Sequence, residues 1–284
     1  MRSIYRSTAG EEAVRTWCAE RLAVWQVPHE RRVFDAQGAE THVVVTGGGT
    51  GRATVVVVPG TNFNAATLLP LTSALASRYR TVVVDVPGQP GLSSGERGLA
   101  EGRLDWYGSW LSQVVETCAP GPGPVVVLGH SFGAAIALSA ASPRVDGQVL
   151  VSPGGLTGLR LTPGVLYASA AWVGLPRPRH SARLLRTMYA AGGTPRPELA
   201  EWMTLVARHA RSSGAPGLAT VPDGAAPRRV VVTGEQDVFL PPRRLGAVVR
   251  RKLGVELEVV ERAGHLVPEE RPELLAALVD RVTG

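Results

Sequence analysis

The sequence has few cysteines and almost no lysine. Two cysteines, Cys18 and Cys118, in 284 residues are too few for a disulfide scaffold or for a zinc cluster of thiolates alone. We expect both to be reduced, buried thiols of a cytosolic protein. Only Lys252 among the 30 basic residues is a lysine, and the arginines are scattered along the chain. The net charge of +6 is accompanied by no nucleic-acid motif, so we expect no nucleic-acid partner.

The sequence also lacks a long apolar run. Its longest mostly apolar stretch, around residues 165–176, is too short to cross a bilayer. The first 17 residues are polar and neither end carries a lipidation motif, so we expect no signal peptide and no membrane partner. Hydrophobic residues make up 44% of the chain and charged residues 19%, which is the balance of a globular protein with a sizeable core.

Runs of β-branched residues alternate with helix-like segments over most of the chain. The runs are typical of strands buried on both faces of a sheet, and they lie at residues 54–58, 81–86, 125–128, 148–152, 229–233 and 257–260. Helical spacing of apolar residues occurs at 65–77, 104–118, 132–141, 242–252 and 272–282. This alternation predicts an α/β fold with a mostly parallel sheet.

The N-terminal part precedes this alternation. Apolar residues at helical spacing predict a helix over residues 10–25, which Pro28 would end. Short extended runs at 32–34 and 42–46 predict a hairpin at the edge of the sheet. The glycine-rich segment 47–51 is not followed by a helix, so we expect a loop there and not a phosphate-binding turn.

A long segment between residues 152 and 229 has no strong strand. A structureless loop of that length would be unusual, and helix-like pieces occur in it at 165–173, 181–191 and 197–212. They predict a helical subdomain at 153–226, inserted into a core formed by 1–152 and 227–284. It could be a plain addition or a lid over a site. Its arginines at 177, 179, 183 and 186 could attract an acidic substrate, although a solvated face explains them more simply.

The segment Gly129-His130-Ser131-Phe132-Gly133 is a G-x-S-x-G motif between a buried strand and a small-residue helix. So sharp a turn strains the backbone of the serine and leaves no room for side chains two positions away on either side. It would place Ser131 Oγ at a helix N-terminus, where the macrodipole favours negative charge. A turn with a capping serine would look similar, but the strand and helix around the motif favour a nucleophile.

A serine nucleophile needs a base, and the base needs an orienting acid. His265 follows the last predicted strand, and loops at the carboxyl ends of parallel strands are where α/β sites form. His130 adjoins Ser131, but consecutive side chains point apart, so we expect it to be structural or to line a pocket. Asp237 also follows a strand and is the preferred acid, with Glu235 in reserve. The order Ser…Asp…His is that of one hydrolase fold.

An oxyanion formed at Ser131 would need backbone donors. We expect these to be the N–H of Phe132, directly after the serine, and the N–H of Thr61, in the loop after the first buried strand. That loop could equally be a plain turn, with Asn62 and Asn64 as cap or turn residues.

Apolar residues adjoin the expected catalytic positions and populate the insert. As pocket residues we expect Phe63, His130, Trp172, Phe239 and Leu266. They would accept an acyl or aromatic group, although aromatic residues and methionines at helical spacing more often form a core. No residues have the spacing of zinc or iron ligands, so we expect no metal and no cofactor.

With these motifs, nearly the whole chain resembles the α/β-hydrolase superfamily, and most of all its bacterial carboxylesterase-like members. The likeness is carried by Trp-Gln-Val-Pro at 25–28, Val-Pro-Gly at 58–60, Asp-Val-Pro-Gly-Gln-Pro-Gly-Leu-Ser at 85–93, the serine motif, and Gly-His-Leu-Val-Pro at 264–268. The resemblance implies an eight-stranded sheet with one antiparallel strand and a helical cap between strands six and seven. It also implies that Asp85 and Gly88 shape the turn after the fourth strand.

The sequence departs from relatives in two places. Pro59 stands where many family members have a histidine, and this changes the surroundings of the expected Thr61 donor. Ser131 stands where the dehalogenase and epoxide-hydrolase branches have an aspartate, which argues against both.

The function expected is hydrolysis of a small ester or lactone through an acyl-enzyme on Ser131. One alternative uses the same three residues in non-hydrolytic chemistry, such as acyl transfer to an alcohol, perhydrolysis or biosynthetic proton transfer. Another is a hydrolase-fold binding protein without turnover, against which the intact set of serine, acid and histidine speaks. The sequence does not indicate an oligomeric state.

Overall fold

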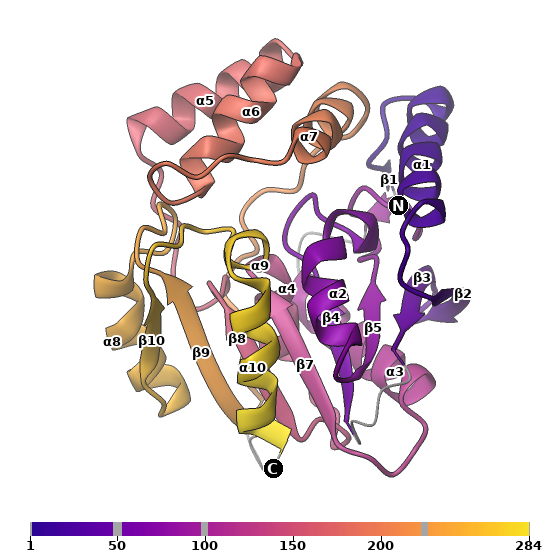
Figure 1. Ribbon diagram of the computed structural model, residues 1–284, viewed down its shortest axis with the longest axis vertical. Helices are drawn as coiled ribbons and strands as arrows, with labels where there is room; N and C mark the ends of the chain where they lie inside the picture. The colour runs from indigo at the N-terminus through magenta and orange to yellow at the C-terminus, as the bar shows by residue number, and fades with distance from the viewer. Residues whose placement is uncertain (1, 48–52, 98–101, 223–226, 284) are drawn as a thin grey trace.

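The computed structural model describes residues 2–47, 53–97, 102–222 and 227–283. A sheet of eight strands forms the middle of the molecule (Figure 1). From edge to edge its strands are β10 (Leu257–Val260), β9 (Arg228–Gly234), β8 (Gly147–Val151), β7 (Val125–His130), β4 (Thr54–Val58), β5 (Arg80–Val84), β3 (Ala39–Thr46) and β2 (His29–Ala36). β3 is antiparallel to β5 and β2, and the other neighbours are parallel. The predicted fold class, including the single reversed strand, is confirmed.

Valine fills the central strands because helices cover both faces of the sheet. Successive side chains of a strand point to opposite faces, so the four buried valines of β4 fit only a sheet covered on both sides. One face packs against α1 (Thr8–Ala23), α2 (Leu69–Ala76) and α10 (Pro272–Thr283), and the other against α3 (Arg103–Cys118), α4 (Phe132–Ser139) and α8 (Pro242–Leu253). Cys18 and Cys118 are free and buried, one on each side, as expected.

The predicted strands and helices of the core agree with these elements to within a few residues at each end, except that one predicted helix is two separate elements. The predicted helix 65–77 is two elements, the 3-10 helix η1 (Ala65–Thr67) and α2, because Asn64 and Thr67 form a capping box and a proline lies in the first turn of α2. Three very short elements were not predicted, since they are too short to show a periodicity. They are β1 (Arg2–Ser3), β6 (Glu96–Arg97) and α9 (Val267–Glu270).

The insert contains three helices that stand at the carboxyl ends of the parallel strands (Figure 1). They are α5 (Pro163–Gly174), α6 (Pro178–Met188) and α7 (Pro197–His209), between β8 and β9, the sixth and seventh strands of the sheet in chain order. Each begins with a proline, whose missing N–H costs nothing in the first turn. The prediction began α6 three residues too late, at residue 181, and it extended α6 and α7 three residues too far.

Some sequence predictions fall on residues that the structure does not describe. The predicted end of the insert at residue 226 lies there, as do residues 48–51 of the glycine-rich segment. Among the residues that are described, no helix combines the length and the apolar character needed to traverse a bilayer.

The insert packs firmly against the N-terminal helix and the loop after β4. The indole of Trp202 in α7 lies against that of Trp17 in α1, with ring centroids 4.8 Å apart. Its Nε1 also donates a hydrogen bond to the carbonyl oxygen of Asn62 (2.7 Å). The insert is therefore joined to the core by side-chain packing as well as by the chain itself.

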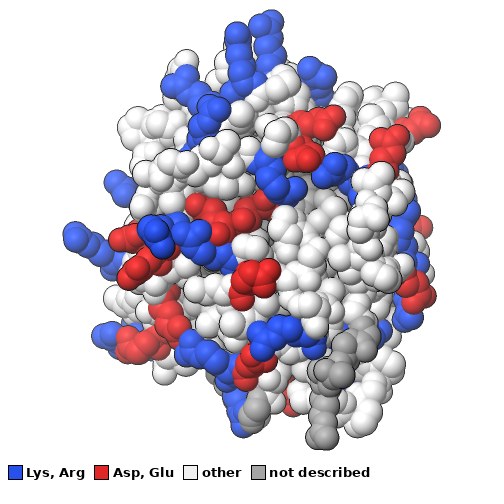
Figure 2. Space-filling model, in the orientation of Figure 1, with Lys and Arg blue, Asp and Glu red and all other residues white. Residues whose placement is uncertain are grey.

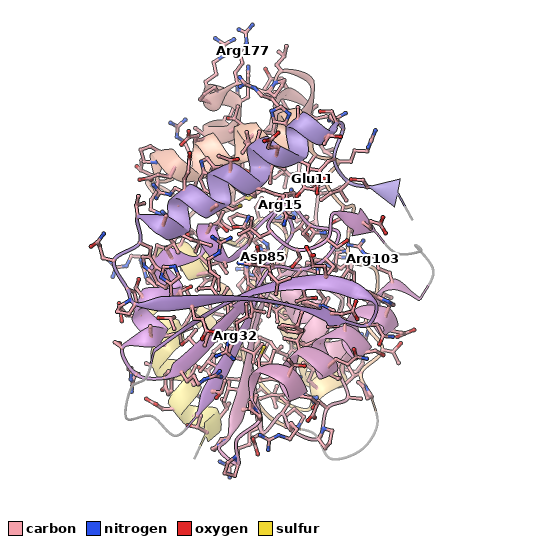
Figure 3. The ribbon with its side chains drawn as sticks, turned by 90° about the vertical axis from the view of Figure 1, so that its right-hand side faces the viewer. Glu11, Arg15, Arg32, Asp85, Arg103 and Arg177 are labelled. Carbon is pink, nitrogen blue, oxygen red and sulfur yellow. The ribbon has the colours of Figure 1, made fainter. Side chains whose placement is uncertain are left out.

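The carboxylate of Asp85 orders the turn after β5, as the family resemblance implies. It accepts hydrogen bonds from the backbone N–H groups of Ala65 and Leu92, both at 2.8 Å, and lies 3.3 Å from His42 Nδ1. Burial disfavours its charged form, but His42 and these N–H groups outweigh burial and lower the pKa of Asp85. Gly88 has a φ of +72°, which explains the glycine in this turn. Figure 3 shows Asp85 in the interior, below α1.

Two helical glycines provide a test of the packing. A Cβ on Gly133 in α4 would lie 2.0 Å from the Val58 carbonyl oxygen, whereas a Cβ on Gly246 in α8 would have its nearest neighbour, a Leu257 carbon, at 3.8 Å. We expect Gly133→Ala to lower the free energy of unfolding by about 2 kcal/mol or more. Gly246→Ala should raise it by about 0.5–1 kcal/mol, because alanine favours the helix. Urea unfolding measures both, and changes of the same sign would contradict the packing described.

Candidate active site

Ser131 occupies a strained turn between β7 and α4. Its φ of 52° and ψ of −107° are rare for a residue with a side chain. A Cβ on Gly129 would lie 2.7 Å from Ala134 Cα, and Gly133 is as crowded, so both glycines of the motif are required sterically. The Ser131 side chain makes no capping hydrogen bond to α4. The alternative of a simple capping serine is therefore wrong.

The structure brings together the three residues that the sequence singled out. His265 Nε2 lies 3.1 Å from Ser131 Oγ, and His265 Nδ1 lies 2.8 Å from Asp237 Oδ2. Because a carboxylate only accepts, Nδ1 carries the proton and Nε2 is free to accept from the serine hydroxyl. Glu235, the reserve acid, is exposed and accepts a hydrogen bond from the Arg262 N–H instead.

Asp237 is buried, and its surroundings keep it ionised. Burial disfavours the carboxylate, but the charge and hydrogen bond of His265 and the N–H of Leu240 outweigh burial. The pKa of Asp237 therefore lies well below its ordinary value. The N–H groups of Phe239 and Leu240 both donate to Oδ1 at 2.9 Å, and the Thr233 hydroxyl donates to Oδ2 at 3.1 Å. A permanently charged acceptor thus fixes the orientation of the His265 ring.

The loop that carries His265 rests on the end of α6. The carbonyl oxygen of Met188 accepts hydrogen bonds from the N–H groups of His265 (2.6 Å) and Leu266 (3.2 Å). A Cβ on Gly264 would lie 2.3 Å from the same oxygen, so glycine is needed before the histidine. The insert therefore takes part in positioning His265.

Two glutamates of α9 strengthen this junction. The Glu270 carboxylate accepts from the N–H of Ala190 (2.8 Å) with one oxygen and from the N–H of Gly264 (2.7 Å) with the other. Glu269 pairs with Arg196, which precedes α7, through two hydrogen bonds of 2.8 and 3.0 Å. The sequence analysis missed all three side chains. Their only signal was an acidic pair near His265, since their partners in the insert, Ala190 and Arg196, lie more than 70 residues away along the chain.

His130 supports His265 from the other side. Its Nε2–H donates to the carbonyl oxygen of His265 (2.9 Å), and the two ring centroids lie 5.1 Å apart. Burial lowers the pKa of His130 to about 3, and the electrostatic interaction between the two imidazoles acts in the same direction. A Cβ on Gly60 would lie 2.8 Å from its Nδ1, so the glycine after Pro59 makes room for the ring. His130 is thus a neutral support that also lines the cavity, as its position beside Ser131 indicated.

The loop after β4 is held in place by the side chains of Gln89 and Ser212, which both bind Asn62. Asn62 has a φ of 65°; its N–H donates to Gln89 Oε1 (3.1 Å) and its Nδ2 to Ser212 Oγ (2.8 Å). Within the described residues, the N–H groups of Thr61 and Phe132 have no hydrogen-bond partner. Phe132 is the first residue of α4, where an N–H has no partner inside the helix. Both groups are therefore free to bind something else.

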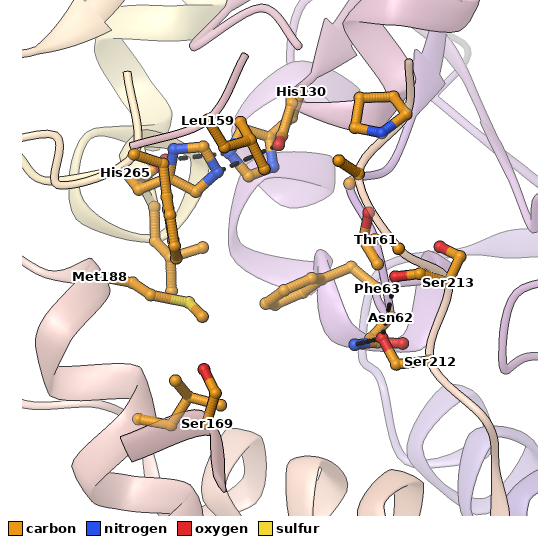
Figure 4. Close-up of a pocket in the computed structure, with 18 of the residues that line it drawn as sticks. Thr61, Asn62, Phe63, His130, Leu159, Ser169, Met188, Ser212, Ser213 and His265 are labelled. Carbon is orange, nitrogen blue, oxygen red and sulfur yellow. Dashed lines mark hydrogen bonds between the residues drawn. The ribbon is translucent and has the colours of Figure 1, made fainter. Parts of the chain in front are cut away.

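A cavity of about 380 Å³ opens beside Ser131 and His265 (Figure 4). The five residues expected to line it do so: Phe63, His130, Trp172, Phe239 and Leu266. The insert adds Ser169, Leu184, Met188 and Met203, so α5, α6 and α7 all contribute. None of the described lining residues is Lys, Arg, Asp or Glu, and the cavity can therefore hold an uncharged, largely apolar group.

The described residues offer no obvious place for a metal ion. No group of three or more His, Cys, Asp or Glu side chains is found in them with the geometry of a metal site.

The two tryptophans of the insert have different roles. Trp172 lines the cavity, whereas Trp202 is fully buried against Trp17 and belongs to the core.

The low pKa of His130 makes a prediction about acid stability. The pKa of an unfolded histidine is about 6.5, so the unfolded chain is protonated at this residue below that pH. In the folded protein His130 stays neutral until the pH falls to about 3. His130 thus contributes stability above pH 6.5 that is lost, at up to about 1.4 kcal/mol per pH unit, as the pH falls towards 3. We expect His130→Gln to show a shallower decline, measured by urea unfolding across this range. If the free energy of unfolding fell equally steeply with pH in the wild type and in His130→Gln, His130 would not be neutral in the folded protein.

The two hydrogen bonds that the Glu270 carboxylate accepts lead to a second prediction. Glutamine has one acceptor oxygen where Glu270 uses two, so Glu270→Gln would leave the N–H of Ala190 or of Gly264 facing an amide NH₂. We expect a loss of about 2 kcal/mol in unfolding free energy and faster amide exchange at the affected N–H. Glu273→Gln, at an exposed position of α10, is the matched control and should change neither. Equal effects of the two variants would show that Glu270 does not hold the junction.

The chain is similar in sequence or in structure to several known proteins. Lipase LipV of Mycobacterium tuberculosis is 29% identical over 210 residues, covering 64% of this chain and 79% of the lipase. Naproxen esterase of Bacillus subtilis has a TM-score of 0.75 at 20% identity, covering 97% of this chain and 99% of its own. Carboxylesterase CesB of the same organism has a TM-score of 0.73 at 18% identity, covering 97% and 98%. At such identities, the two structural likenesses establish the fold.

A family model assigns the chain more directly. The model described as the alpha/beta hydrolase family matches residues 55–278, which include β4 to β10, the insert and all of Ser131, Asp237 and His265. This match covers well over half of the sequence, and the fold agrees with it. The chain therefore belongs to the alpha/beta hydrolase family.

Proposed function

We propose that the protein is a serine hydrolase that cleaves a carboxylic ester or lactone through an acyl-enzyme on Ser131. The observation that carries this proposal is the hydrogen-bonded series from Ser131 through His265 to Asp237, at the wall of an uncharged cavity. The names of the similar proteins agree with it, since they describe a lipase, a carboxylesterase and a naproxen esterase.

In the first step Ser131 attacks the substrate carbonyl. His265 Nε2 takes the hydroxyl proton as the Oγ–C bond forms, and Asp237 stabilises the resulting imidazolium. When the tetrahedral intermediate collapses, the ester bond breaks and the alcohol leaves with the proton from His265. The acyl group remains on Ser131. In a lactone the leaving hydroxyl stays attached to the acyl group.

In the second step water repeats the sequence. His265 accepts a proton from water, hydroxide adds to the acyl carbon, and the proton returns to Ser131 Oγ as the acid leaves. We assign the unpartnered N–H groups of Thr61 and Phe132 to the oxyanion of both intermediates. A donor of this kind contributes about 3 kcal/mol to lowering the barrier.

We also propose that the insert acts as a cap on this site. In this proposal residues 153–226 form the cap, and 1–152 with 227–284 form the core. Three observations support it: all three insert helices line the cavity, the end of α6 holds the His265 loop, and Trp202 packs on α1. The cap residues Trp172, Met188 and Met203 would then set the size of the acyl or alcohol group.

A fluorophosphonate probe tests the proposed nucleophile. It phosphonylates only an activated serine, so we expect one adduct by intact mass, located on Ser131 by peptide mapping and absent from Ser131→Ala. Ser169→Ala is the matched control, because Ser169 lines the same cavity but has no histidine beside it, and it should label normally. An ester and lactone panel with product analysis then distinguishes water from other acyl acceptors.

The labelling experiment can also reject the proposal. If folded wild-type protein formed no adduct, or if the adduct lay on Ser169 or persisted in Ser131→Ala, Ser131 would not be the nucleophile. Acyl transfer to an added alcohol in preference to water would keep the nucleophile but replace hydrolysis as the reaction.

A further inference from the structure

The outer face of α5 and its flanks is apolar and open to solvent. Five large hydrophobic side chains there, which we call the α5 patch, are each 51–60% exposed: Leu161, Leu166, Tyr167, Val173 and Leu175. They are half of the ten exposed large hydrophobic residues found in the described parts of the chain. Such a concentration within fifteen residues of sequence marks an interaction surface rather than scattered surface residues.

The helix beneath this patch has no charged residue at all. α5 reads Pro-Gly-Val-Leu-Tyr-Ala-Ser-Ala-Ala-Trp-Val-Gly, and its inner face buries Val165, Ala168 and Trp172. The helix is therefore apolar on the inside, where it meets the protein, and on the outside, where nothing covers it. A helix that is hydrophobic all round normally lies in an apolar environment on every side.

Arginines flank the α5 patch, before and after it in the sequence and on the neighbouring helix α6. Five exposed ones form what we call the arginine rim: Arg160, Arg177, Arg179, Arg183 and Arg186. None of them forms an ion pair with a carboxylate in the described structure, and the Arg183 guanidinium lies over the Tyr167 ring, 4.7 Å from its centroid. Figure 2 shows basic side chains around white surface at the end of the molecule that carries α5 and α6, and Figure 3 shows Arg177 projecting from it.

The charge of the whole chain is concentrated in this part. Residues 153–226 contain eight arginines and three acidic residues, so they carry +5 of the net charge of +6. The rest of the chain is nearly neutral. Whatever covers the α5 patch must therefore be negatively charged around an apolar centre.

We propose that the α5 patch and the arginine rim together dock the protein onto an anionic lipid bilayer. The apolar side chains would enter the boundary between headgroups and acyl chains, and the arginines would bind the lipid phosphates. This contact needs no membrane-spanning segment. The expectation of no membrane partner rested on the absence of a spanning segment, a signal peptide and a lipidation motif, and none of these is needed for a peripheral contact through a folded surface.

Two other occupants fit the surface less well. In a two-fold dimer the same patch would face itself, so one arginine rim would lie against another and repel it. An acidic protein partner would need hydrogen bonds across the contact, about one per 100–200 Å². The α5 patch itself offers only the Tyr167 hydroxyl for these, so nearly all of them would have to come from the arginine rim, whereas acyl chains require none.

The patch also reaches the mouth of the cavity. Leu161 belongs to the patch and to the cavity lining, and Ser169 of α5 lines the cavity as well. Docking through α5 would turn the cavity towards the bilayer, from which an apolar molecule could enter without crossing water. The docking itself involves neither Ser131 nor His265, so it stands or falls independently of the proposed reaction.

Vesicle co-sedimentation tests the proposal with the full chain. We expect binding to phosphatidylcholine vesicles that contain phosphatidylglycerol, weaker binding to pure phosphatidylcholine, and release by salt. Leu166→Ser with Val173→Ser should weaken binding about tenfold or more. The matched control is Val24→Ser with Val33→Ser, two residues that are just as exposed but lie directly after α1 and on β2, and it should bind as wild type does.

A second pair of variants tests the charge. Arg177→Gln with Arg179→Gln should reduce the preference for anionic vesicles, whereas Arg243→Gln with Arg251→Gln, two exposed arginines of α8, should leave it unchanged. Ser131→Ala should bind vesicles fully even though it cannot react with a fluorophosphonate. Retained urea midpoints and retained fluorophosphonate labelling in the patch and rim variants show that they are folded.

Three results would overturn the proposal. Absence of binding to anionic vesicles at low salt is one, and equal loss of binding in the patch and control variants is another. The third is a dimer, seen by light scattering, that disappears in Leu166→Ser with Val173→Ser, because it would assign the patch to a second copy of the chain.

Discussion

The orientation of one imidazole ring, that of His265, depends on hydrogen bonds from three separate parts of the chain. The loop after β9 supplies the Asp237 carboxylate, the last residue of β7 supplies the His130 N–H, and the insert supplies the carbonyl oxygen of Met188. Because these partners come from both the core and the insert, displacing the end of α6 would move the histidine. The segment after α6 and the start of α7 are tied to α9 through Glu270 and Arg196, so a shift of either helix would be transmitted to the loop that carries His265.

Backbone strain in this protein is concentrated around the site. Of the five described non-glycine residues with positive φ, four closely follow the carboxyl ends of parallel strands: Asn62 after β4, Ser131 after β7, Ser152 after β8 and Arg262 after β10. Strain of this kind persists only where surrounding structure over-determines it. Here the sheet and the buried loops supply that constraint, and the four residues bring the loop of Thr61, the serine and the histidine to one edge.

The sequence was informative wherever a short segment determines its own structure. The valine runs located the strands, and the glycines around Ser131 located the turn, because strand burial and steric crowding are local effects. Asp237 and His265 could be selected because both follow predicted strands whose carboxyl ends share one edge. Glu270, Glu269 and Arg196 could not be found, since each joins the His265 loop to the insert through a partner distant in sequence. Thr233, four residues before Asp237, likewise gave no sign that its hydroxyl would meet the carboxylate.

The composition of the insert follows from its two surfaces. Its inner surface lines a cavity without charged side chains, so α5 must be apolar there, and Trp172 meets this need while its Nε1 donates to the Met203 carbonyl oxygen (2.7 Å). A globular protein would then be expected to place charges on the outer face of the same helix. In this chain the charges stand beside that face, on α6, and are all of one sign. An apolar helix with adjacent arginines is the arrangement that an anionic, apolar surface would stabilise and that water alone would not favour.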